Sequence, residues 1–312
     1  MNNTLMEHAD QTIAVGSKSF ATAAKLFDAP TRRGVLMLYA WCRHCDDVID
    51  GQALGFNIET PEATPAEQRL ETLKSETRRA WEGAVMTEPA FAAFQEVALG
   101  HNIPLPLALA HLEGFAMDVR ETRYESFEDT LLYCYRVAGV VGLMMARIMG
   151  VRDEAVLDRA CDLGLAFQLT NIARDIVEDA RVGRCYLPAR WLAEVGLTPE
   201  QVADPGKRQQ VARLAQRLVA EAEPYYASAR AGLAGLPLRS AWAIASAHGV
   251  YREIGVKVSA AGEQAWDKRQ GTNALEKSAL LMKGAALALT SRFGSQAPRP
   301  AGLWQRPLLA SA

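Results

Sequence analysis

Two pairs of aspartates, each spaced four residues apart on an apolar helical segment, constrain this chain more than any other feature. In residues 163–180, LGLAFQLTNIARDIVEDA, the polar residues Gln168, Asn171, Asp175 and Asp179 follow one another at intervals of three, four and four. At about 100° per residue they fall on one stripe of an α-helix. The remaining positions are mostly apolar, as in a buried helix. The segment therefore predicts a buried helix with one acidic stripe.

A second segment, residues 38–50, repeats this arrangement near the start of the chain. Its sequence LYAWCRHCDDVID places Tyr39, Arg43, Asp46 and Asp50 on one stripe, at intervals of four, three and four. Buried carboxylates without partners are too costly to keep, so both stripes should face a cavity that holds something cationic. Mg²⁺ suits such a site because it binds one or two carboxylates and completes its shell with water and phosphate oxygens. The doubled stripe predicts a shared metal–diphosphate site.

Other interpretations of the aspartates have to be weighed against this one. A single DxxxD on a helix is usually a solvated acidic face, because aspartate is mostly exposed in proteins. Two copies on otherwise apolar helices favour the metal site. A helical scaffold that uses the stripes for partner contacts is one competitor. A di-iron bundle is another, but it needs Glu-x-x-His ligand pairs, which the aspartate segments lack.

The composition is that of an ordinary globular protein. The 312 residues are 49% hydrophobic and 22% charged, with a formal net charge of −2, which gives no electrostatic reason to expect nucleic-acid binding. The N-terminal MNNTLMEHADQT is polar, unlike a signal peptide. The longest apolar run, residues 137–146, is about half of a membrane span. We expect a cytoplasmic protein that can still rest on a bilayer.

Cys42 and Cys45 form a CxxC pair among five cysteines. A zinc or redox role is the functional interpretation, but the sequence contains no second CxxC and no HxxxH to complete a zinc site. In a cytosolic chain these thiols should be reduced. We expect both side chains to point away from the Tyr39–Asp50 stripe and to fill the core.

Apolar spacing of helical period dominates the whole chain and predicts one all-α domain over residues 1–295. A capping box at Thr64 predicts one further helix start. The Pro-rich tail, residues 296–312, is expected to be loosely ordered. The principal predicted helices span 5–27, 31–50, 88–99, 105–122, 127–149, 153–180, 207–231, 238–260 and 275–292.

Three further stretches leave alternatives open. Residues 16–20, GSKSF, carry two hydroxyls and an ammonium that could bind phosphate or form a solvated turn. Gly139 and Gly142 lie in an apolar helix, where each costs about 1 kcal/mol relative to alanine. They serve either close helix packing or an apolar ligand. Residues 248–252 and the cations of 257–269 either reach the site or form a solvated face.

The motifs SKSF, LYAWCRHCDDVID, YCYRVAGVVG, QLTNIARDIVED and GRCYLP together resemble the squalene/phytoene synthase family, and most closely its bacterial carotenoid-forming members. They extend from residue 17 to about residue 188, with weaker agreement around Tyr251, and neither aspartate pair departs from the family pattern. The resemblance implies an isoprenoid synthase fold in which the aspartate helices face each other across a central cavity.

The resemblance also implies a reaction. Two geranylgeranyl diphosphates would condense head to head through prephytoene diphosphate to phytoene, with Mg²⁺ or Mn²⁺ and without NADPH. The nearest alternatives are dehydrosqualene and squalene synthases, which use two C15 diphosphates. Membrane-anchored squalene synthases end in an apolar span and use NADPH, whereas this sequence contains neither such a span nor a GxGxxG loop. Head-to-tail prenyltransferases and terpene cyclases lack the YCYRVAGVVG and GRCYLP segments.

Residue roles follow from the same resemblance. Asp46 and Asp50 match the first metal-binding motif, and Asn171, Asp175 and Asp179 match the second. The four aspartates are expected to be catalytic together with Arg43 and Tyr39. The expected substrate contacts are Ser17, Lys18, Ser19, Phe20, Tyr39, Arg43, Tyr135, Val137, Gly139, Gln168, Arg174 and Tyr251.

The expected partners follow from the implied chemistry. Geranylgeranyl diphosphate is the small-molecule substrate, and no nucleic acid is involved. A C40 hydrocarbon is insoluble in water, so peripheral contact with the inner face of the membrane is expected. Contact with the preceding and following enzymes of carotenoid synthesis is a further expectation.

Overall fold

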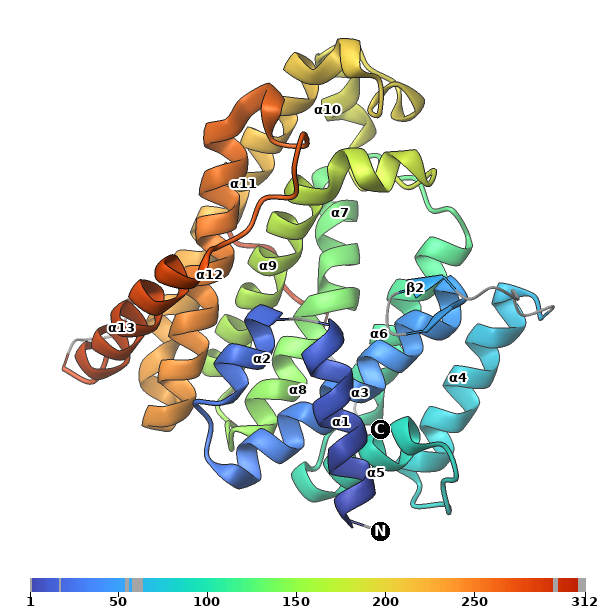
Figure 1. The fold of residues 1–312 in the computed structure, drawn as a ribbon, viewed down its shortest axis with the longest axis vertical. Helices are drawn as coiled ribbons and strands as arrows, with labels where there is room; N and C mark the ends of the chain where they lie inside the picture. Colours follow the sequence, from blue (N-terminus) through green and yellow to red (C-terminus); the bar gives the residue numbers. More distant parts are fainter. Residues whose placement is uncertain (1, 17, 54–55, 58–63, 294–296, 308–312) are drawn as a thin grey trace.

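Over its described residues the protein is a bundle of α-helices with one short antiparallel pair of strands (Figure 1). The computed structural model describes residues 2–16, 18–53, 56–57, 64–293 and 297–307. The predicted all-α architecture is confirmed. The helices are α1 Asn2–Gly16, α2 Lys18–Ala24, α3 Ala29–Asp50, α4 Ala66–Trp81, α5 Pro89–His101, α6 Leu105–Val119, α7 Phe127–Cys134, α8 Val140–Ile148, α9 Glu154–Arg181, α10 Ala189–Glu194, α11 Arg208–Ala231, α12 Leu238–Ala261 and α13 Ala274–Thr290. The strands are β1 Gln52–Ala53 and β2 Phe56–Asn57, paired antiparallel.

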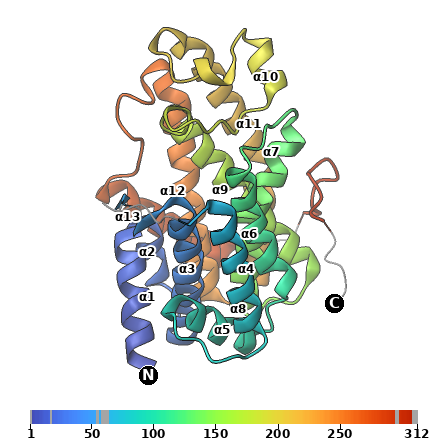
Figure 2. The same cartoon turned by 90° about the vertical axis from the view of Figure 1, so that its right-hand side faces the viewer.

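Helix α9 is the central element, and it contains the second aspartate pair. In Figure 1 it runs through the middle of the bundle, between α11 and α12 on one side and α7 and α8 on the other, and it contacts all four. Figure 2, turned by 90°, again shows α9 near the centre of the bundle. Its most extensive contacts are with α11. Asp153 caps its start by accepting a hydrogen bond from the Ala155 N–H at 2.8 Å. A helix with apolar side chains around most of its circumference is stable only when neighbours surround it.

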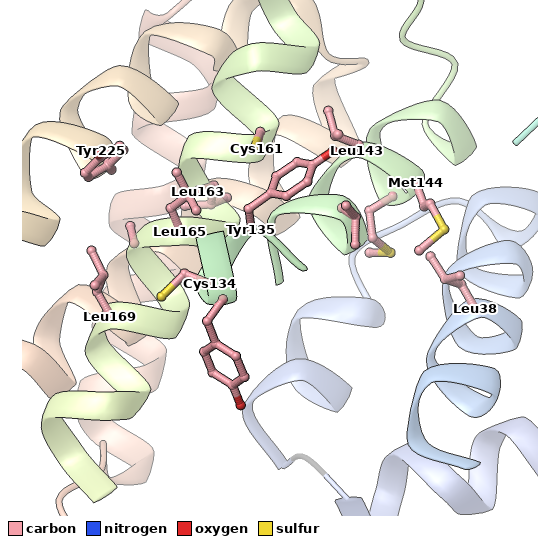
Figure 3. Close-up of a cluster of buried hydrophobic side chains, with 14 of the residues drawn as sticks. Leu38, Cys134, Tyr135, Leu143, Met144, Cys161, Leu163, Leu165, Leu169 and Tyr225 are labelled. Atoms are coloured by element: carbon pink, nitrogen blue, oxygen red, sulfur yellow. The ribbon is translucent and has the colours of Figure 1, made fainter. Parts of the chain in front are cut away.

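The predicted helix 127–149 is interrupted by a π-helical turn, Tyr135–Gly139, between α7 and α8. Glycines allow this region to approach α9. A Cβ atom on Gly164 would lie 2.4 Å from the Ala138 carbonyl oxygen, and one on Gly142 would lie 2.4 Å from that of Ala160. Figure 3 shows the buried side chains around this crossing, with Tyr135 beside Cys161 of α9. Close helix packing is therefore one function of these glycines.

The segment Phe127–Ile148 is long and apolar enough, by length and composition, to cross a membrane. In the bundle, 61% of its most apolar window is buried against other helices. Neighbouring helices, rather than lipid, therefore cover most of its apolar surface in this structure.

Two features differ from the sequence prediction: the start of α4 and the order of the C-terminal tail. The cap residue of α4 is Pro65, which makes no side-chain cap, so the capping box predicted at Thr64 is wrong. The described part of the tail, residues 297–307, is also not loose. Arg299 donates to both carboxylate oxygens of the fully buried Asp162, at 2.9 and 2.7 Å, and Leu303 is buried. A buried carboxylate requires a partner, and the tail supplies it.

Candidate active site

A cavity of about 610 Å³ lies between α3, α6, α8, α9 and α12. Along α9, the lining positions run from Val156 to Arg174, which is about 27 Å at 1.5 Å per residue. Charged side chains gather near the aspartate pairs, and the rest of the wall is mainly apolar. The apolar wall includes Phe115, Val137, Ala138, Val141, Gly142, Met145, Ala146, Met149, Val156, Ala160, Leu163, Gly164, Phe167, Leu233, Leu236, Ile244 and Ala247.

We call the charged end of the cavity the mouth; it is lined by Arg43, Asp46, Asp50, Asp118, Arg174, Arg184 and Arg269. Helix α3 supplies one side of it. Tyr39, Arg43, Asp46 and Asp50 all line the cavity, as their helical spacing predicts. Cys42 also lines it, so the expectation that this thiol points away from the stripe is wrong. At 300° from Tyr39, Cys42 falls beside the stripe rather than opposite it. Its partner in the CxxC, Cys45, is fully buried in the core as expected.

Arginines form ion pairs with three of the four aspartates. Arg43 lies 3.2 Å from Asp46 on the same helix. Arg184, which follows α9, lies 2.5 Å from Asp50 and so joins the two aspartate helices. Asp175 is held by Arg174 at 2.5 Å and by Arg269 at 3.3 Å. Arg174, Arg184 and Arg269 line the cavity, whereas Asp175 and Asp179, expected to face it, are not among its lining residues.

The remaining electrostatics favour the binding of a cation among these carboxylates. Burial, reinforced by the neighbouring charge of Asp175, raises the pKa of Asp179 to about 7. Burial also raises the pKa of Asp46 to about 6, with Arg43 opposing the shift and Asp50 adding to it. Carboxylates with raised pKa values are poorly compensated, and a bound cation would favour their charged form.

Sequence reasoning did not place Arg184 and Asp118 at the mouth. Asp118 of α6 accepts hydrogen bonds from the hydroxyls of Tyr133 at 3.2 Å and Tyr186 at 3.1 Å, and burial raises its pKa to about 6. Arg184 lowers the pKa values of Asp46, Asp118 and Asp179. The available signal for Arg184 was its place in GRCYLP, directly after the second aspartate pair.

Aromatic rings lie where the charged mouth meets the apolar wall. Tyr251 of α12 stacks on Phe167 of α9 with 4.1 Å between ring centroids, and both line the cavity with Tyr39. Burial raises the pKa of Tyr39 to about 12, so its hydroxyl stays protonated at neutral pH. Aromatic faces in this position attract positive charge through their quadrupoles.

The predicted substrate contacts are only partly brought together. Val137, Gln168, Arg174 and Tyr251 line the cavity alongside Tyr39 and Arg43. Tyr135 and Gly139 do not. The Tyr135 ring instead lies 5.5 Å from that of Trp304 in the tail, and Gly139 packs against Cys161. The physical reason is the helix turn: Tyr133, two residues earlier, points into the cavity, so Tyr135 points away from it.

The SKSF segment falls outside this comparison. Ser17 lies outside the described residues, and the side chains of Lys18, Ser19 and Phe20 are not described either. Their expected substrate contacts stay predictions.

The donor chemistry fits a hard divalent cation. Asp46 and Asp50 on α3 and Asn171, Asp175 and Asp179 on α9 offer oxygen ligands, as Mg²⁺ prefers. Within the described ranges, however, no three acidic, histidine or cysteine side chains are gathered tightly enough to form a ready-made ion site. Asp46, Asp175 and Asp50 are instead paired with arginines.

An all-α bundle with an apolar cavity, whose mouth alternates arginines and aspartates, defines a class of enzyme. A cavity of this kind suits substrates with an anionic head and a long apolar tail, and this combination is typical of the isoprenoid synthases. The chain belongs to the squalene/phytoene synthase family, whose sequence profile matches residues 13–276. The family resemblance expected from the motifs is thereby confirmed, and the protein is an enzyme of the prenyltransferase type.

Relatives of known activity match almost the whole chain. The 15-cis-phytoene synthase of Pantoea ananas is 68% identical over 99% of this chain and 100% of its own length. The phytoene synthase of Pseudescherichia vulneris is 64% identical over 97% of this chain and 98% of its own. A crystal structure of a dehydrosqualene synthase with a ligand has a TM-score of 0.81, 26% identity, and coverage of 92% of this chain and 98% of that one. The expected isoprenoid synthase fold is confirmed.

Proposed function

We propose that this protein catalyses the phytoene synthase reaction, in which two geranylgeranyl diphosphates condense head to head through prephytoene diphosphate to phytoene. The observation that carries this proposal is the 68% identity to a 15-cis-phytoene synthase over the full length of that relative. The geometry of the cavity supports it, because a cationic mouth opens onto a long apolar interior.

The arginines of the mouth bind the diphosphate. Arg43, Arg174, Arg184 and Arg269 each line the cavity and each holds an aspartate. Guanidinium groups match phosphate oxygens with two parallel hydrogen bonds. An arriving diphosphate can therefore take over these donors, which frees the carboxylates for a metal ion.

The metal ligands in this proposal are Asp46, Asp50, Asn171, Asp175 and Asp179, with Mg²⁺ or Mn²⁺ as the ion. When bound, the ion neutralises the charge that develops on the diphosphate leaving group. The arginines add electrostatic stabilisation at the same place. The expected independence from NADPH stays part of the proposal.

The apolar wall then surrounds the carbocation and shields it from water. In the first step the C–O bond of one allylic diphosphate breaks, and its electron pair leaves with the diphosphate. The cation bonds to the double bond of the second substrate, and loss of one proton closes the cyclopropane. The second step releases the other diphosphate and another proton. Exclusion of water prevents quenching, and the rings of Tyr39, Phe167 and Tyr251 face the positive charge.

The released diphosphate is the proposed base. The described wall offers one histidine, His111, and burial lowers its pKa to about 4, so this imidazole is a weak base. The product is an insoluble hydrocarbon, and peripheral contact of the protein with a membrane is part of this proposal, as is an association with the neighbouring enzymes of the pathway.

A product assay tests the proposal. Purified protein is incubated with Mg²⁺ and geranylgeranyl diphosphate, without NADPH, and a C40 hydrocarbon with a conjugated triene is expected. Product from farnesyl diphosphate alone would replace the C20 substrate with the C15 one. If the folded protein forms no product from either substrate, the proposal that it is this enzyme is wrong.

A matched pair of arginine variants tests the mouth. Arg184→Gln removes the cation that joins the two aspartate helices, and kcat/KM should fall about 100-fold or more. Arg181→Gln removes an exposed arginine one turn earlier and should change kcat/KM by less than about threefold. Equal effects of the two substitutions would contradict the assignment of Arg184 to diphosphate binding.

A further inference from the structure

Helix α13 has an outer face that is apolar and exposed. Leu275, Met282 and Leu289 are 84%, 70% and 52% exposed, and Ala279 and Ala286 between them are also exposed. At 100° per residue, these five side chains lie within about 40° of one direction. We call them the outer stripe. Phe293, in the turn after the helix, is 89% exposed. A contiguous apolar surface of this kind marks a contact site.

The opposite face of α13 is firmly packed on α12. A Cβ atom on Gly284 would lie 2.5 Å from the Ser246 hydroxyl oxygen, and Trp242 donates its indole N–H to the Leu281 carbonyl at 2.8 Å. In Figure 1, α13 lies at the outer edge of the bundle beside α12. The outer stripe is thus displayed by a helix that is already fixed in place.

The charges around the outer stripe are mainly positive. Residues 274–293 contain Lys277, Lys283 and Arg292 but a single acid, Glu276. That acid is paired with Lys257 of α12 at 2.6 Å. Lys283 is exposed about 80° from the centre of the outer stripe, whereas Lys277 lies on the opposite side of the helix. Arg292, in the turn after α13, is exposed, and its guanidinium donates to the carbonyls of Ala234 and Leu236. An apolar helix face flanked by cations has the chemistry of an interfacial membrane helix, with affinity for anionic lipid headgroups.

The position of α13 also connects it to the cavity. Ile244, Ala247 and Tyr251 of α12 line the cavity, while Ser246 and Gly249 of the same helix contact α13. One helix layer, α12, therefore separates α13 from the apolar cavity, and the outer stripe lies on the far side of α13. A bilayer on the outer stripe would lie two helix layers from the place where a hydrocarbon forms.

We infer that the outer stripe of α13 docks this protein on an anionic lipid bilayer. This inference gives a surface to the membrane contact of the proposed function and rests on it for the identity of the hydrocarbon. A second copy of the chain is the competing occupant, but the cations flanking the stripe would repel their own copies there, whereas they attract an anionic surface.

Vesicle binding tests the inference. Full-length protein is mixed with vesicles of equimolar phosphatidylglycerol and phosphatidylcholine, and the bound fraction is measured by sedimentation. The double variant M282E/L289E should lower the partition coefficient about tenfold or more, because two apolar anchors become anionic. The control V85E/L99E places the same two charges on exposed apolar residues away from α13, and should bind like the wild type.

The outcomes separate the surface from the enzyme. With detergent-dispersed geranylgeranyl diphosphate, M282E/L289E should keep kcat within about twofold of the wild type, because α13 does not line the cavity. Equal partitioning of M282E/L289E and the wild type would overturn the docking surface while leaving the enzyme intact. A wild-type dimer that M282E/L289E splits, with no vesicle binding by either, would also overturn it. Loss of all activity in the wild type would instead overturn the proposed function.

Discussion

At the scale of single residues, each arginine at the mouth of the cavity interacts with one or more acidic side chains. Arg184 pairs with Asp50 and also lowers the pKa values of Asp46, Asp118 and Asp179. The aspartates could be predicted from sequence because the helical period alone places them on one side. Arg184 and Asp118 could not, because they come from a loop and a third helix whose approach depends on tertiary packing.

Asp118 should make stability depend on pH in a predictable direction. Burial raises its pKa from 3.8 to about 6 in the folded protein. The folded state therefore holds its proton more tightly than the unfolded state, and this group's contribution to stability falls as pH rises between about 4 and 6. Asp118→Asn removes the titration. Relative to this variant, the wild type should lose about 2 kcal/mol of unfolding free energy over that range.

Urea unfolding at pH values from 4.5 to about 7.5 measures this difference. Asp267→Asn, on an exposed carboxylate, is the control and should differ from the wild type by less than about 0.5 kcal/mol at each pH. A constant difference between the wild type and Asp118→Asn would show that Asp118 has an ordinary pKa in the folded protein.

At the scale of elements, the presence of a helix is easier to predict from sequence than the direction in which each of its side chains points. The sequence predicts one helix over residues 127–149, but it gives no sign of the π-helical turn at Tyr135–Gly139. It also assigns Tyr135 to the substrate site, because a motif match carries no information about which tyrosine faces inwards. Trp304 of the tail occupies the side of the turn that Tyr135 faces. The tail's ion pairs likewise depend on partners far away in the chain.

The crossing of α8 and its π-helical turn over α9 requires glycine at residue 164. In Gly164→Ala the new Cβ would lie 2.4 Å from the Ala138 carbonyl oxygen, so the backbones must separate. We expect a loss of about 1–3 kcal/mol, measured by denaturant unfolding. Gly100→Ala is the control, since its Cβ meets nothing within 4 Å on α5, and alanine there should be neutral or stabilising by up to about 1 kcal/mol. Similar unfolding midpoints for both variants would contradict the close crossing.

At the scale of the whole molecule, the two aspartate helices come from distant parts of the chain and meet only through the fold. Arginines now satisfy three of the four carboxylates. We therefore expect a metal ion or a diphosphate that binds alone to leave charges uncompensated, whereas the two together can exchange the existing pairs. Ligand binding to the folded state raises the unfolding temperature, by a stabilisation of about 2.7 kcal/mol at one hundred times Kd.

Thermal unfolding with Mg²⁺, with inorganic diphosphate, and with both tests this coupling. The combination should raise Tm by more than the sum of the two separate shifts. Asp46→Asn on α3 and Asp179→Asn on α9 should each remove the additional shift, because each aspartate belongs to one half of a single site. Asp267→Asn, exposed and outside both stripes, should keep it. If Asp46→Asn loses the shift while Asp179→Asn retains it, the ion is held by α3 alone, and the site does not join the two halves of the bundle.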